Sequence, residues 1–168
     1  MTSFGLRTGG LAALAVMLVA IGAAWGFQLI GGIMPCPLCL EQRIAYYIAI
    51  PVAIAALLLA RRARLVARLL LLGAAAVMAW TAGLGIYHAG AEWAFWPGPN
   101  TCGGAGEEVL DASNLLAAIE ESRLVSCTQD TGRVLGLSFA GWNVVAASAS
   151  AAVLLISALR PGRDVAVT

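Results

Sequence analysis

Four long apolar stretches constrain the fold of this 168-residue chain more than any other feature. Each reaches or approaches the ~20 residues that a helix needs to cross the hydrocarbon core of a bilayer. We expect helices at about residues 11–30, 37–60, 65–88 and 139–159. Helices are expected because backbone polar groups in lipid must be satisfied within their own segment. The sequence therefore predicts an all-α integral membrane four-helix bundle, with residues 1–168 forming a single transmembrane domain.

The composition agrees with a lipid environment. The chain is 61% hydrophobic and 11% charged, with a mean hydropathy of +0.88. A soluble domain of this size could not hide that much apolar surface. The first stretch has one alternative interpretation, a cleaved signal peptide with Arg7 before it and small residues near Ala23 and Ala24. Its apolar run is longer than a usual signal-peptide core, so we expect it to be retained as a helix.

The arginines predict the orientation of the helices. All ten basic residues are arginine, and seven of them fall on one side of the expected bundle. These seven are Arg7, Arg61, Arg62, Arg64, Arg68, Arg160 and Arg163. Positive residues concentrate on the cytoplasmic side, so both termini are expected inside and the connections 31–36 and 89–138 outside. The second connection carries seven acidic residues against two arginines, which agrees with this orientation.

The long outer connection has two further features. Residues 113–123 place apolar side chains on one face and acidic ones on the other, which indicates a short amphipathic helix lying on the membrane. Trp93, Phe95 and Trp96 are typical of an interfacial aromatic belt.

All four cysteines lie on the predicted outer side: Cys36, Cys39, Cys102 and Cys127. An even number confined to the oxidising side is what disulfide chemistry requires. Inert buried cysteines should instead scatter through the helices. Two purely structural disulfides and a zinc site are further alternatives. The Cys-x-x-Cys spacing closes too small a loop to restrict an unfolded chain much, and the second pair lacks metal-like spacing. We therefore expect redox activity and no metal.

The stretch "PCPLCLEQR" places the first pair in a reactive setting. Pro37 suits the first position of a helix, so Cys36 is expected at the helix cap, where free N–H groups stabilise thiolates. Arg43 follows Cys39 by four residues and therefore shares its helix face. A snorkelling arginine is the alternative, but this is the side where arginine is least expected, so we favour a ligand-binding role. His88 is either structural or part of the pocket that Arg43 faces.

With these features the chain resembles the DsbB family of bacterial inner-membrane thiol oxidases. The resemblance covers essentially the whole chain, from residue 11 to residue 159. It rests on "CPLCLEQR", on the later cysteine pair in the second outer connection, and on the strings "YHAGAEWAFWPGP" and "LGLSFAGWN". A lone Cys-x-x-Cys is weak, whereas four helices with two cysteine pairs in this order are specific.

The resemblance implies a function and a set of roles. A thioredoxin-fold partner of the DsbA type would attack a Cys102–Cys127 disulfide at Cys102. Cys127 would then attack Cys36 and displace Cys39 as a thiolate beside Arg43. Cys39 would pass electrons to a quinone, ubiquinone or menaquinone, with Arg43 and His88 lining its pocket. The predicted location is the bacterial inner membrane, with the cysteines on the periplasmic side.

Two other functions compete with this one. Enzymes like vitamin K epoxide reductase also combine four helices, a quinone and cysteines, but there the loop pair precedes the Cys-x-x-Cys, whereas here it follows. A non-enzymatic membrane protein braced by structural disulfides is the second alternative.

Overall fold

The structure of the protein is a computed structural model that describes residues 5–98 and 133–160. Within those residues the chain forms four long helices and one small hairpin. The elements are α1 (Leu6–Leu29), α2 (Pro37–Leu59), α3 (Arg64–Glu92), β1 (Arg133–Val134), β2 (Leu137–Ser138) and α5 (Phe139–Leu159). All four helices are long and apolar enough to cross a membrane. The predicted class, an all-α four-helix membrane bundle, is therefore confirmed.

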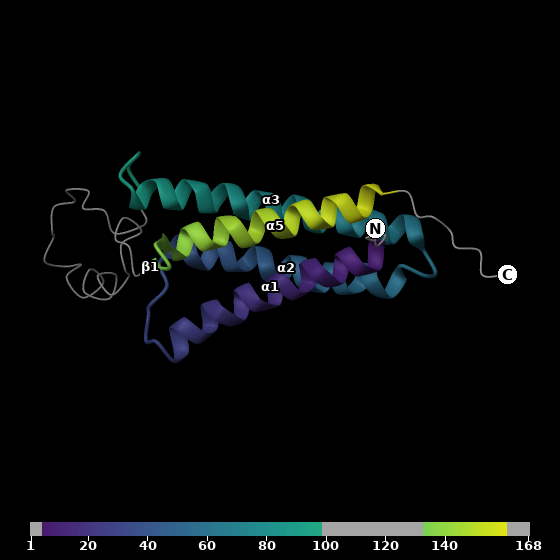
Figure 1. Ribbon diagram of the computed structural model, residues 1–168, viewed down its shortest axis with the longest axis horizontal. Coiled ribbons are helices and arrows are strands. Elements are labelled where there is room, and N and C mark those ends of the chain that lie inside the picture. Colours follow the sequence, from purple (N-terminus) through teal and green to yellow (C-terminus); the bar gives the residue numbers. More distant parts are fainter. Residues whose placement is uncertain (1–4, 99–132, 161–168) are drawn as a thin grey trace, which may run out of the picture.

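The helices run alternately up and down, and each packs mainly against two neighbours (Figure 1). Around the bundle the order is α1, α2, α3 and α5, with α5 closing the ring against α1. The first residues of α1 and the last residues of α5 lie at one end (Figure 1). Arg68 of α3 donates a hydrogen bond to the carbonyl of Arg160 at 2.9 Å, which joins α3 to α5 at that end. The connection between α1 and α2, which carries Cys36, lies at the opposite end.

Small residues line the places where the helices meet. Fully buried alanines occur in every helix, and a few larger side chains fill the remaining space. The fully buried core includes Ala13, Met17, Ala49, Ala53, Ala56, Ala67, Leu71, Met78, Ala147 and Leu154. Small side chains allow close approach of helix backbones, and lipid provides no hydrophobic force to drive the helices together, so packing contacts must do so.

The large apolar side chains point outward instead. Val19, Leu58 and Trp80 are 72%, 75% and 71% exposed. In water such a surface would be a liability, whereas in a bilayer it faces lipid tails of the same polarity. The bundle thus has mostly small side chains in its interior and large apolar side chains on its surface, which suits a lipid environment.

The third helix is one turn longer than predicted. It was expected to end at about His88, where the apolar run stops, but it continues to Glu92. Trp96 folds back over this last turn, and its indole N–H donates to the Tyr87 carbonyl at 2.8 Å. Its ring occupies the space above Gly90, where any side chain would clash. This tertiary contact extends α3 beyond the apolar sequence.

The residues just before α5, at the end of the predicted outer connection 89–138, form a hairpin. Strand β1 pairs with β2 antiparallel, and Leu135 and Gly136 between them both have positive φ, as a type I′ turn requires. The indole of Trp142 donates to the Val134 carbonyl at 2.8 Å and ties the hairpin to α5. The amphipathic helix predicted at residues 113–123 lies outside the described residues.

A bulky side chain should be tolerated only on the lipid face of α3. Ala74 is 1% exposed in the core, whereas Ala76 of the same helix is exposed. We expect Ala74→Leu to reduce the free energy of unfolding by about 1–3 kcal/mol, because overpacking forces neighbouring helices apart. Ala76→Leu is the matched control and should change it little. Thermal unfolding in detergent measures both, and equal losses would contradict the packing described above.

Candidate functional site

The first cysteine pair marks the start of α2. Pro37 is the first helical residue, and Cys36 is the N-cap, as predicted. The backbone N–H of Cys39 donates to Cys36 Sγ at 3.2 Å. The two sulfur atoms lie 2.8 Å apart as thiols. A disulfide between them therefore needs only a small adjustment of the side chains.

The two thiols differ in their surroundings. Cys36 is 3% exposed, whereas Cys39 is only partly buried and lines a cavity. The hydrogen bond with Cys39, together with burial, raises the pKa of the Cys36 thiol above its usual value. The backbone N–H of Cys39 that bonds to the Cys36 sulfur opposes this shift, because it stabilises the thiolate.

Arg43 joins α2 to α1 beside Cys39. Its guanidinium donates to the side-chain oxygen of Gln28 and, at 3.3 Å, to the carbonyl of Ala24. It also lies 5.6 Å from the centre of the Trp25 ring, a cation–π distance. Within residues 5–98 and 133–160, no carboxylate forms a salt bridge with Arg43. Neutral groups therefore hold the Arg43 guanidinium in place, and no carboxylate of the described residues neutralises its charge.

His88 reaches the cysteines from α3. The residue is 2% exposed, and its Nε2 lies 3.6 Å from Cys36 Sγ. Because α3 continues past His88, Glu92 lies one turn further along the helix, with Oε1 3.7 Å from the same nitrogen. The helix predicted at about residues 65–88 therefore ends later than expected, at Glu92. The histidine sits inside the last turns and links the cysteine pair to α3.

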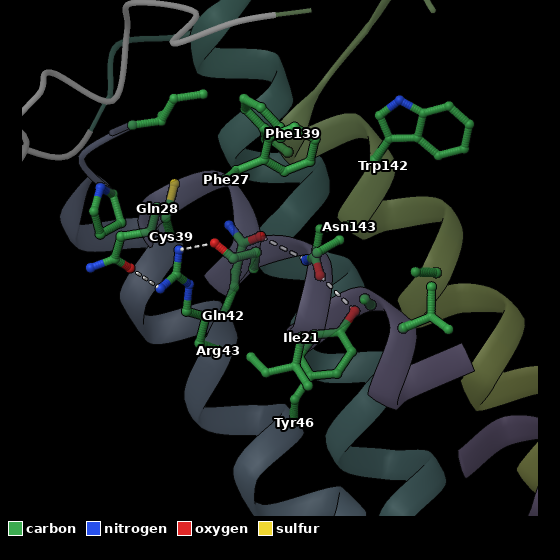
Figure 2. A pocket seen from close by; sticks show the side chains of 18 of the residues that line it. Ile21, Phe27, Gln28, Cys39, Gln42, Arg43, Tyr46, Phe139, Trp142 and Asn143 are labelled. Carbon is green, nitrogen blue, oxygen red and sulfur yellow. Dashed lines mark hydrogen bonds between the residues drawn. The ribbon is translucent and has the colours of Figure 1, made fainter. Parts of the chain in front are cut away.

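A buried chain of polar side chains continues from His88 across the bundle. His88 Nδ1 lies 3.1 Å from Gln42 Nε2, Gln42 Oε1 accepts from Asn143 at 2.6 Å, and Asn143 Oδ1 accepts from the Tyr46 hydroxyl at 2.7 Å. Figure 2 shows the Tyr46–Asn143–Gln42 part of this chain. Asn143 approaches α3 closely because Gly85 opposite it has no side chain. These hydrogen bonds join α2, α3 and α5.

Sequence reasoning did not single out Gln42, Asn143 or Tyr46. A usable signal was present, since a glutamine and an asparagine within apolar helices are costly and usually functional or paired. Their partners come from different helices, however, and the sequence does not say which helices are neighbours.

A cavity of about 570 Å³ lies between α1, α2 and α5, next to these hydrogen-bonded side chains. Most of its lining is apolar and comes from α1 and α5. A few polar groups converge at one side: Gln28, Cys39, Gln42, Arg43, His88 and Asn143. Figure 2 shows Cys39 and Arg43 together with Phe27, Phe139 and Trp142 around this space. An apolar space with a few placed polar groups is typical of a small-molecule site.

The same sulfur and nitrogen atoms form a potential metal-ligand set. The ligand atoms of Cys36, Cys39 and His88 all lie within 4.8 Å of one another. Two thiolates and an imidazole suit a soft metal such as zinc. The sequence prediction of no metal considered only the spacing of the four cysteines. The histidine that completes this set comes from a different helix.

The structure thus brings together four of the six predicted site residues, Cys36, Cys39, Arg43 and His88. Cys39, Arg43 and His88 line the cavity, and Cys36 lies behind Cys39. The other two predicted residues, Cys102 and Cys127, lie outside the described residues.

A family model described as disulfide bond formation protein DsbB matches residues 6–157 of the chain. No curated protein sequence matches the chain, and no solved structure does.

The difference in burial predicts different rates of alkylation in the reduced pair. Cys39 should react with iodoacetamide faster than Cys36, because Cys36 is almost fully buried and Cys39 lines the cavity. Mass spectrometry of full-length protein after brief treatment with limiting reagent measures the two rates. Faster labelling of Cys36 would contradict the burial described for the pair.

Proposed function

The chain belongs to the DsbB family, and on that basis we propose that it passes two electrons from a dithiol protein to a membrane quinone. Family membership makes it an oxidoreductase of disulfide bond formation, and its four apolar helices make it a multi-pass membrane protein. The partner, the quinone and the roles of individual residues are the proposal.

The observation that carries it is that Cys39 and Arg43 line the same apolar cavity. A quinone has a flat ring with two carbonyl oxygens and an apolar tail, and it travels in the hydrocarbon core. The cavity fits this chemistry, because its walls are apolar and the guanidinium of Arg43 supplies N–H groups at one side. A quinone bound there would take up two electrons and two protons and leave as quinol.

The residues of this chain supply the other half of the reaction. A thiolate of the partner attacks a Cys102–Cys127 disulfide at Cys102, and Cys127 is released. Cys127 attacks Cys36 of a Cys36–Cys39 disulfide, and Cys39 leaves as a thiolate beside Arg43. The second thiol of the partner then displaces Cys102, and the partner leaves oxidised.

Return to the starting state follows by the same exchange chemistry. Cys102 attacks Cys127, so the Cys102–Cys127 disulfide forms again and Cys36 is released as a thiol. The Cys36–Cys39 dithiol then gives up two electrons and two protons and closes to its disulfide. The sum is one partner dithiol oxidised for each quinone reduced.

Arg43 is well placed to favour these steps. Its charge is not neutralised by a carboxylate of the described residues, and it lies one helical turn from Cys39. A nearby cation stabilises a thiolate, and a guanidinium also donates hydrogen bonds to a ring oxygen that gains negative charge.

The proposed location is the bacterial inner membrane, with both termini in the cytoplasm and the cysteine pairs in the periplasm. The arginines near residues 61–68 support this orientation, because positive loops stay inside. The short connection before Cys36 then faces the side where disulfides persist.

The proposed electron transfer is tested by mixing the purified full-length protein with a reduced thioredoxin-fold donor and a ubiquinone analogue. Quinone absorbance should fall as the donor is oxidised, with one quinone consumed per donor dithiol. No loss of absorbance with folded protein would reject the proposed function. Cys102→Ala should abolish donor oxidation, whereas continued oxidation would reject the role given to Cys102.

The role of Arg43 predicts a selective kinetic effect. Arg43→Ala should raise the apparent KM for the quinone by about tenfold or more, since a charge-assisted hydrogen bond is lost, and should change the KM for the donor less. Arg62→Ala, an exposed arginine at the other end of the bundle, is the matched control and should change neither. An unchanged quinone dependence in Arg43→Ala would remove Arg43 from the quinone site.

A further inference from the structure

The reduced cysteine pair and His88 bring three potential ligand atoms close together. The two sulfurs lie 2.8 Å apart, and His88 Nε2 lies 3.6 Å from Cys36 Sγ. In a tetrahedral site with Zn–S distances of about 2.3 Å and Zn–N distances of about 2.0 Å, a sulfur and a nitrogen stand roughly 3.5 Å apart and two sulfurs roughly 3.8 Å. The spacing of sulfur and nitrogen therefore already suits zinc, and the two sulfurs need to separate by about 1 Å.

Cys39 has room for that movement. Its side chain is only partly buried and lines the cavity, whereas Cys36 is 3% exposed at the helix cap. His88 lines the same cavity, so an ion held between His88 and Cys39 can take a water molecule from that side as its fourth ligand. Three protein ligands with one exchangeable position are common among zinc sites that are not purely structural.

The groups around the three ligands suit a divalent cation. The backbone N–H of Cys39 donates to Cys36 Sγ at 3.2 Å, which stabilises a thiolate there. Glu92 Oε1 lies 3.7 Å from His88 Nε2, so a carboxylate stands beside the site. Two thiolates balance the charge of Zn²⁺, and Glu92 balances Arg43, so the buried group carries no net charge. Thiolate and imidazole ligands also favour zinc over Mg²⁺ and Ca²⁺, which prefer oxygen.

Gln42 can support the imidazole from behind. Binding through Nε2 leaves the ring proton of His88 on Nδ1, 3.1 Å from the Gln42 amide. The amide then turns so that its oxygen accepts this proton, and the Asn143 amide turns with it. The Tyr46 hydroxyl can accept as well as donate, so the hydrogen bonds among these four side chains are all kept. An outer partner of this kind fixes the orientation of a histidine that binds a metal.

We propose that the reduced Cys36–Cys39 pair and His88 bind one zinc ion, and that the bound ion holds the pair reduced. Each thiol gives up its proton, the two sulfurs and one imidazole nitrogen bind the ion, and no electron is transferred. Thiolates bound to zinc do not join in a disulfide. In the oxidised pair the sulfurs are already bonded to each other, so the site exists only in the dithiol.

This inference rests on the proposed function, in which the pair alternates between dithiol and disulfide. The dithiol appears after the partner has been oxidised and before the quinone is reduced. Zinc captures the pair at that stage and stops the cycle there. The site therefore adds a metal-dependent control to the proposed electron transfer.

Metal binding is tested on full-length protein that carries Cys102→Ser and Cys127→Ser, so that only the first pair can bind. The protein is reduced in detergent without quinone, and zinc is titrated in competition with a chromophoric chelator. We expect one ion per chain in the reduced protein and none in the oxidised protein. Equal binding in the two states, or no binding to the reduced protein, would overturn the proposal.

His88→Ala tests whether the imidazole is a ligand. Loss of an outer partner alone costs about 10–100-fold in metal affinity, so loss of a direct ligand should cost about 100-fold or more. Thr81→Val is the matched control, because Thr81 is fully buried and donates to the backbone carbonyl of Gln42 at 3.3 Å. Its affinity should equal that of the parent protein. Unchanged affinity in His88→Ala, or an equal loss in Thr81→Val, would mean that His88 is not a ligand.

X-ray absorption at the zinc edge keeps the test decisive if His88→Ala does not fold, as judged by circular dichroism. The zinc-loaded parent protein should show two sulfurs at about 2.3 Å and an imidazole nitrogen at about 2.0 Å. A zinc ion with sulfur ligands and no imidazole would reject the site.

The control of disulfide formation is measured with diamide, which takes two electrons and two protons from a dithiol. Bound zinc should slow closure of the Cys36–Cys39 disulfide at least tenfold, and excess chelator should restore the rate. An unchanged rate with zinc bound would overturn the proposed control. None of these measurements needs quinone or partner, so absent quinone reduction would reject the proposed function while leaving the zinc site standing.

Discussion

The site depends on one constraint, that every polar group buried in the bundle must find a partner inside the protein. Gln42, His88 and Asn143 come from α2, α3 and α5, and Gln42 forms hydrogen bonds with both of the others. Because the partners lie on three helices, the hydrogen bonds also hold those helices in register at the end where the cysteines lie. The alanine-rich contacts below this layer bring the helices close enough for the bonds to form.

Helix α1 stands outside this network and is held differently. Its main connection to α2 at this end is Arg43, which bonds to Gln28 and to the backbone of Ala24. The cavity lies between α1 and the other helices, beside that connection. Arg43 thus holds α1 to α2 beside the cavity, whose lining it shares with Cys39. A site with an apolar wall and a polar, positively charged side suits an amphipathic electron acceptor.

Much of this arrangement could be predicted from residues that are close in sequence. The apolar stretches predicted four helices of correct type, and "PCPLCLEQR" predicted the helix start at Pro37, the cap at Cys36 and the shared face of Cys39 and Arg43. The end of α3 was not predicted, because Trp96 folds back over Gly90 and supports a turn that hydropathy does not mark. Glu92 joined the site only through that extra turn.

The sequence by itself determined the class of the protein, the helix that carries the first cysteine pair, and the family. These rest on composition, on helical spacing and on a local motif, all of which act over a few residues. Only the tertiary structure decided which groups meet the cysteines. His88 lies 52 residues along the chain from Cys36 and reaches it because α3 packs beside α2. Asn143 lies 107 residues from Cys36 and reaches Gln42 of α2 from across the bundle, since α5 packs against α1 and α3. The direction of the hydrogen bonds among these side chains also depends on the packing, since the partners of an amide side chain determine which way its oxygen and nitrogen face.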